Sequence, residues 1–183
     1  MRNLKLITLI LFIANFVYAQ QGITSQGELA GTQGDYGTYY GYAAGMSATG
    51  VSNVYVGANA GKNAGTGRHN VAIGNNALTT NTTGQNNVMI GNNAGSNNGV
   101  GGDNVFVGAY AGNDNNSGYD NVVLGATAGA KIAGNKNVFI GRAAGNMLPS
   151  GGGNVFIGFQ AGSKLQTSTS SKLYIQNSDD TAK

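Results

Sequence analysis

The sequence predicts an all-β fold, a parallel β-solenoid of about eight coils of 16–17 residues, and three observations lead to it. A pattern of the form Asn-Val-x-aliphatic-Gly recurs seven times at steps of 16 or 17 residues. Its two aliphatic residues are two positions apart, which is the period of a β-strand. No 3.6-residue apolar period appears, and β-branched residues stand beside glycine in every copy. A fixed period this short is typical of a solenoid in which each repeat forms one coil.

Each copy continues past the strand with Gly-x-x-Ala and then with a stretch rich in Gly and Asn. The invariant Gly permits a sharp bend, the small Ala is expected to re-enter the core, and the remainder turns the chain back. Asparagines in register are expected to stack amide on amide, each bonding to the copies above and below it. The predicted ladder consists of Asn53, Asn70, Asn87, Asn104, Asn121, Asn137 and Asn154.

The repeat domain is expected to span residues 37–178, from a first copy that begins with Gly in place of Asn to a modified last copy at residues 172–175. Residues 1–19 are predicted to be a signal peptide, because Arg2 and Lys5 precede an apolar run that ends in small residues at 17–19. That run of twelve is too short to span a bilayer, so no membrane span is expected. Residues 20–36 would be a lead-in and 179–183 a C-terminal tail.

The composition limits the classes of partner. The 183 residues include 32 Gly, about 25 Asn, no Cys and only 9 % charged residues. Disordered low-complexity sequence has a similar composition, but apolar residues at fixed intervals favour a folded repeat. Without Arg2 and Lys5 the 10 basic residues become 8, against 7 acidic ones, and no Lys or Arg run remains. We therefore expect no nucleic-acid partner, and neither disulfides nor thiol chemistry.

Groups that could carry out catalysis are scarce. His69 is the single histidine, and it stands in a turn between strands. The carboxylates Asp103, Asp114 and Asp120 lie in variable turns, so a paired acid–base site or a Ser-His-Asp arrangement is not expected. The stretch 99–103 superficially resembles a calcium-binding repeat, but such repeats need Asp in successive turns. The sequence predicts no enzyme, no cofactor and no metal site.

The repeated "NVFIGxxAG" unit resembles the head domains of trimeric autotransporter adhesins (YadA-like heads), whose repeats follow the form "NAxAIGxxA". The ending "SKLYIQNS" at residues 171–178 is similar to the close of repeat arrays in bacterial surface proteins and phage tail-fibre-like proteins. The resemblance covers about residues 37–178, although the coils here are longer. It implies a left-handed parallel β-roll in a tight homotrimer, secreted or on the bacterial cell surface.

One column of residues is expected to form the trimer interface. The residue between the two aliphatics of each copy alternates to the opposite side of the strand, which we expect to be the outer face. An uncharged column on an outer face predicts an interface, and the thin coils need added burial. The predicted interface consists of Tyr55, Met89, Phe106, Val123, Phe139 and Phe156, with Ala72 in the same column.

The leading functional hypothesis is a non-enzymatic, adhesin-like structural and binding module whose partner is an extracellular matrix protein or a glycan. The variable turns would then form the exposed ligand surface. Alternatively, the turns are spacers in a purely structural segment of a tail-fibre-like appendage. An ice-binding solenoid is disfavoured by the irregular residues after the invariant Gly, and a polysaccharide hydrolase by the scarcity of acids. The turns are residues 62–69, 79–86, 96–103, 113–120, 130–136, 146–153 and 163–171.

Overall fold

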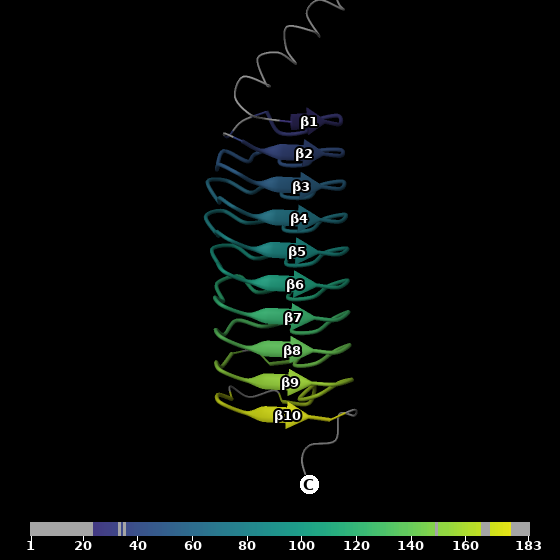
Figure 1. Ribbon diagram of the computed structural model, residues 1–183, viewed down its shortest axis with the longest axis vertical. Helices are drawn as coiled ribbons and strands as arrows, with labels where there is room; N and C mark the ends of the chain where they lie inside the picture. The colour runs from purple at the N-terminus through teal and green to yellow at the C-terminus, as the bar shows by residue number, and fades with distance from the viewer. Residues whose placement is uncertain (1–23, 33, 35, 149, 166–168, 177–183) are drawn as a thin grey trace, which may run out of the picture.

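The computed structural model describes residues 24–32, 34, 36–148, 150–165 and 169–176, which form a β-solenoid. Within these ranges, ten three-residue strands lie in one parallel sheet in chain order, so each coil contributes one strand (Figure 1). The predicted all-β solenoid is thereby confirmed. The strands are β1 (Thr24–Gln26), β2 (Thr38–Tyr40), β3 (Val54–Val56), β4 (Val71–Ile73), β5 (Val88–Ile90), β6 (Val105–Val107), β7 (Val122–Leu124), β8 (Val138–Ile140), β9 (Val155–Ile157) and β10 (Leu173–Ile175).

The ends of the sheet differ in how well they were predicted. Strand β1 pairs with β2, so the solenoid begins within residues 20–36, which were expected to be a lead-in. Strand β10 pairs with β9 and confirms the modified last copy. The predicted signal peptide at residues 1–19 and the tail at 179–183 lie outside the described residues. In the part of the chain that the structure describes, no helix is long and apolar enough to cross a membrane.

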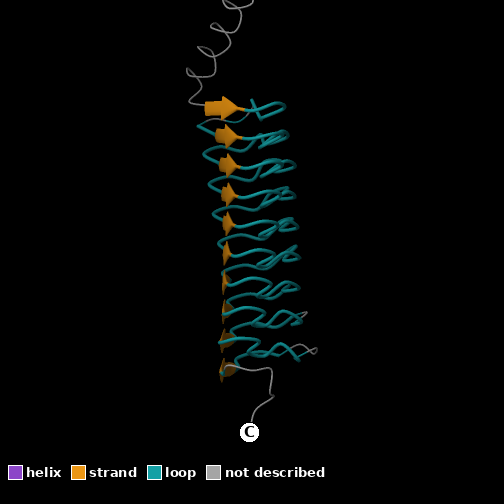
Figure 2. Cartoon of the chain, turned by 90° about the vertical axis from the view of Figure 1, so that its right-hand side faces the viewer, coloured by secondary structure: helices purple, strands orange, loops and turns teal. Residues whose placement is uncertain are grey.

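Every pair of neighbouring strands has the same register. Val71 pairs with Val88, and the relation repeats through the 16-residue step between β7 and β8. The turn absorbs that shorter step: Asn104 donates to the carbonyl of Gly118, whereas Asn121 donates to that of Gly134, one residue nearer in sequence. The sheet thus forms one continuous side of the solenoid, and the turns form the rest (Figure 2).

The invariant glycine after each strand provides the bend that closes the coil. Gly74 has a φ angle of 137°, and a Cβ at this position would collide with the carbonyl oxygen of Gly91 in the next coil. Side chains other than glycine rarely adopt this φ angle, and the close stacking of the coils leaves no room for one. The small residue three positions later is fully buried, as predicted. These residues are Ala60, Ala77, Ala94, Ala111, Ala128, Ala144 and Ala161.

The predicted orientation of the strands is wrong. The central residue of each strand is fully buried within a single chain, so it fills the coil and cannot line the axis of a trimer. The physical reason is the two-residue period: the buried Asn of each copy stands two positions earlier and therefore shares its face. The residues that were expected at the trimer interface, and that form the core instead, are Tyr55, Met89, Phe106, Val123, Phe139 and Phe156, together with Ala72.

This core is a column of stacked side chains. The rings of Phe139 and Phe156 lie 4.9 Å apart and nearly parallel, and Tyr174 meets Phe156 edge-on at 5.2 Å. A glycine lies against the central ring in several coils; a Cβ on Gly112, for example, would overlap the ring of Phe106. The interior of a coil therefore has room for about one large side chain.

Candidate functional site

The predicted asparagine ladder is continuous and tightly bonded. Asn53 Oδ1 accepts two hydrogen bonds from Asn70, from its backbone N–H at 2.9 Å and from Nδ2 at 3.2 Å. Asn70 Nδ2 also donates to the carbonyl of Gly84 at 2.9 Å, which ties the strand entry to the next turn. The pattern repeats down to Asn154, whose Oδ1 accepts the backbone N–H of Lys172. Because its amide groups already have partners, this column supports the fold and offers nothing to a ligand.

A second buried ladder was not predicted. Asn98 Nδ2 donates to Asn81 Oδ1 at 3.0 Å, and Asn115 Nδ2 donates to Asn98 Oδ1 at 2.8 Å. Each of these amides also bonds to the carbonyl of the glycine three residues later. The ladder ends where the next coil carries Ile132, which leaves Asn115 Oδ1 buried without a partner. The signal for this ladder in the sequence is an Asn-x-x-Gly pattern that recurs at steps of 17 residues.

The turns are consequently not simple exposed spacers. Each of six predicted turn segments carries one fully buried side chain at an equivalent position, while the residues around it are largely exposed. The buried members of this column help to close the coil on the side opposite the strand. They are Ala64, Asn81, Asn98, Asn115, Ile132 and Leu148.

The outer face of the sheet carries two columns of aliphatic side chains, which we call the aliphatic face. Its members are partly or largely solvent-accessible in the single chain, with Ile73 40 % and Ile90 37 % exposed. No charged residue occurs in either column from β3 to β9. The aliphatic face comprises Val54, Val71, Val88, Val105, Val122, Val138 and Val155 in one column, and Val56, Ile73, Ile90, Val107, Leu124, Ile140 and Ile157 in the other.

Polar residues border the aliphatic face on the side where the chain enters each strand. Among them are His69, Asp103, Asp120 and Lys136, which are exposed and have φ angles of 56–59°. An apolar centre with a polar rim is the usual arrangement of a protein–protein interface.

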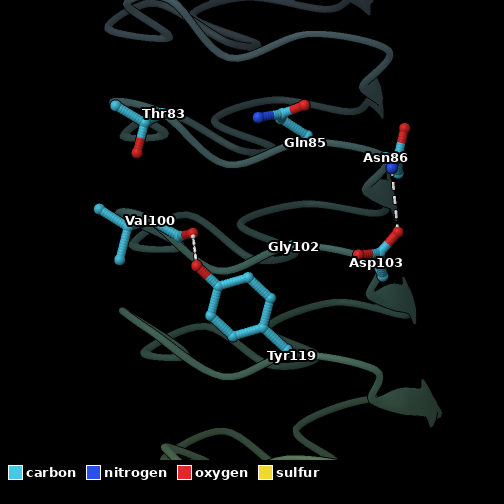
Figure 3. Close-up of a pocket in the computed structure, with 7 residues that line it drawn as sticks. All are labelled: Thr83, Gln85, Asn86, Val100, Gly102, Asp103 and Tyr119. Atoms are coloured by element: carbon cyan, nitrogen blue, oxygen red, sulfur yellow. Dashed lines mark hydrogen bonds between the residues drawn. The ribbon is translucent and has the colours of Figure 1, made fainter.

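A groove of about 330 Å³ crosses three consecutive coils on the turn side of this rim (Figure 3). All of its lining residues come from the predicted turns 79–86, 96–103 and 113–120. Gly102 forms its floor, and a Cβ there would come within 3.1 Å of the Tyr119 ring. The lining residues are Thr83, Gln85, Asn86, Val100, Gly102, Asp103 and Tyr119.

Hydrogen bonds fix both the polar and the aromatic parts of the groove. Tyr119 donates its hydroxyl to the carbonyl of Val100 at 2.8 Å, and its backbone N–H donates to Asn135 Oδ1 at 2.8 Å. Asn86 Nδ2 donates to Asp103 Oδ1 at 3.0 Å. A second hollow, of about 260 Å³, lies between turns nearer the N-terminus and is lined by Thr49, Gly50, Val51, Thr66 and Arg68.

The residues considered for chemistry in the sequence are dispersed. His69 is exposed in a turn, and Asp103 and Asp120 stand in the same column of successive coils, while Asp114 lies in a different column. Among the described residues, no group of three or more His, Cys, Asp or Glu side chains is placed to hold a metal ion. Comparison of the chain with protein-family models, with curated proteins and with solved structures finds no match.

Proposed function

We propose that this chain is a non-enzymatic structural and binding module, secreted or displayed on the bacterial cell surface, that self-associates through the aliphatic face. The observation that carries the proposal is the aliphatic face itself. Sheets made only of parallel strands are normally covered on both faces. Here the coil covers one face, and the other presents two uncharged aliphatic columns over seven strands.

Further copies of the same chain are the occupant that this face fits. Seven strands at ~4.8 Å and three residues at ~3.3 Å give the face an area on the order of 340 Å². That is comparable to the largest apolar patch on most monomers, which is often functional. A standard interface buries about 800 Å² on each partner, so the polar rim must also take part. The resemblance to trimeric adhesin heads gives the number three.

Self-association through the sheet would leave the turns on the outside of the assembly. The columns inside the coil repeat in type, whereas the exposed turn residues differ from coil to coil. Variable side chains on a rigid scaffold are typical of ligand-binding surfaces. We therefore propose that the turns contact an extracellular matrix protein or a glycan.

The self-association is tested by placing charges on the aliphatic face. In the double variant Ile90→Glu, Val107→Glu, two carboxylates would be buried against a partner chain, so the assembly is expected to dissociate. Light scattering after size exclusion should give a trimer for the parent and a monomer for the variant, with the β-type circular dichroism retained. Ser117→Glu, on an exposed turn, is the matched control and should keep the mass of the parent. A monomeric parent, or a variant that keeps its mass, would refute self-association through this face.

The binding part of the proposal is tested by screening the purified protein against matrix proteins and a glycan array. Reproducible binding of one ligand class supports a displayed binding module. An assembled protein that binds nothing would instead support the structural alternative, a segment of a tail-fibre-like appendage.

A further inference from the structure

The groove at Tyr119 arises from one missing side chain. The residue two positions before each ladder Asn forms a column on the turn side, and in three successive coils this column reads Gln85, Gly102 and Tyr119. Because Gly102 lacks a side chain, the ring of Tyr119 lies against its backbone and the space above the ring stays open (Figure 3). The hollow is thus specific to these coils and is not a general consequence of the repeat.

The ring of Tyr119 is held as a rigid platform. Its hydroxyl and its backbone N–H are both hydrogen-bonded, to the carbonyl of Val100 and to Asn135 Oδ1. The side chain nevertheless stays 42 % exposed. A ring that is already fixed loses little conformational entropy when a ligand stacks on it. Its face carries partial negative charge and attracts polarised C–H groups.

Groups that bond to hydroxyls surround this ring. Asp103 offers carboxylate oxygens, Asn86 and Gln85 offer amide donors and acceptors, and Thr83 offers a hydroxyl. The bond from Asn86 Nδ2 to Asp103 Oδ1 orients the carboxylate and leaves Oδ2 with no printed protein partner. The lining contains one carboxylate and no cationic residue, and Asp120 stands in the next coil of the same column as Asp103. This charge pattern disfavours an anionic ligand.

We infer that the groove binds a neutral saccharide unit, with the C–H face of a pyranose on the Tyr119 ring and its hydroxyls on Asp103, Asn86 and Gln85. A volume of about 330 Å³ is near the lower limit for ligand pockets, which suits one or two sugar rings and not a larger molecule. The inference rests on the proposed function, because it names the ligand class of the same turn surface.

The test uses the purified full chain and a panel of methyl glycosides of glucose, galactose, mannose and N-acetylglucosamine. Saturation-transfer NMR should detect binding of at least one of them, with the strongest transfer to the ring C–H protons. Tyr119→Ala removes the platform, and Asp103→Asn removes the charged acceptor while Asn tolerates the positive φ angle. Each variant is expected to weaken binding at least about tenfold, which corresponds to the loss of one charge-assisted hydrogen bond or one stacking contact.

Tyr110→Ala is the matched control, since Tyr110 is 47 % exposed and is not among the groove residues. It should bind like the parent, and all variants should keep the parent's melting temperature within a few degrees. Glycan binding that survives Tyr119→Ala would overturn this inference and leave the proposed function standing. No binding to any glycan or matrix protein would overturn both. Preference for sialylated or sulfated glycans, or for an extended peptide in the groove, would overturn the assignment to a neutral saccharide.

Discussion

Ala72 and Leu78 lie in the same coil, both fully buried, and their sizes are exchanged relative to the neighbouring coils. Elsewhere from β3 to β9 the central strand residue is larger than Ala and the residue six positions later is Gly. In those coils a Cβ at the glycine meets the central side chain: that of Gly61 would overlap the Tyr55 ring, and that of Gly95 would overlap Met89. Leu78 therefore occupies the space that the small Ala72 leaves empty.

This exchange predicts strong coupling between the two positions. Leu78→Gly should lower the free energy of unfolding by about 2–4 kcal/mol, because it leaves a cavity beside Ala72. Ala72→Phe should cost about 1–3 kcal/mol, because the ring would overlap Leu78. The double variant restores the arrangement of the other coils and should approach the parent's stability.

A double-mutant cycle measured by urea unfolding at fixed protein concentration checks this coupling. Fixed concentration matters because self-association would add to the apparent stability. Additive losses would show that the two side chains occupy separate spaces.

The same exchange explains which parts of the structure the sequence could predict. The period, the register and the Asn53-to-Asn154 ladder follow from the pattern of each copy, because in-register stacking is the one arrangement that aligns identical residues. The pattern also fixes that Tyr55 faces opposite to Val54, but not which of the two is inside. Two observations could have decided it: a buried Asn two positions earlier, and the co-occurrence of Ala72 with Leu78 in one copy.

The turn surface was less predictable. The groove depends on the conformation of three turns that differ in sequence and on a ring that crosses from one coil to the next. Only the glycine at 102, between residues with long side chains, indicates it in the sequence. The second ladder, by contrast, is visible as a repeat of Asn81, Asn98 and Asn115, but turns rich in Asn hide it among exposed amides.

A further prediction concerns backbone strain at the second residue after the bend glycine. In successive coils Asn93, Tyr110 and Thr127 hold this position with φ angles of 54°, 59° and 57°. Asn tolerates this region, whereas a β-branched residue there is a rare outlier that costs on the order of 1–2 kcal/mol. Thr127→Asn should therefore stabilise the protein by about 1 kcal/mol, seen as a rise in melting temperature.

The reciprocal variant is the control for this effect. Asn93→Thr should destabilise the protein by a similar or larger amount, because it also removes the hydrogen bond from Asn93 Nδ2 to Asn92 Oδ1. If both variants melt at the temperature of the parent, the strain at this position is negligible.

The last prediction concerns Tyr55, whose hydroxyl is buried without a hydrogen-bond partner and whose ring stacks on Tyr39 at 5.5 Å. Burial, reinforced by the neighbouring Tyr39, raises the pKa of the Tyr55 phenol well above its ordinary value of 10.0. An unpaired buried hydroxyl costs about 1–3 kcal/mol. Tyr55→Phe keeps the ring and removes this hydroxyl, so at neutral pH the variant should be at least about 1 kcal/mol more stable than the parent.

The pH dependence supplies a second readout. Because the pKa is raised in the folded state, the unfolded chain loses the Tyr55 proton first as the pH rises above about 10, and stability falls by up to about 1.4 kcal/mol per pH unit for this group. Below that pH the group is neutral in both states and has no such effect. Tyr55→Phe should flatten the alkaline decline between about pH 10 and 12 without abolishing it, since burial also raises the pKa of Tyr39. Urea unfolding across this range measures it, and parallel curves for parent and variant would mean that the Tyr55 phenol reaches water in the folded protein.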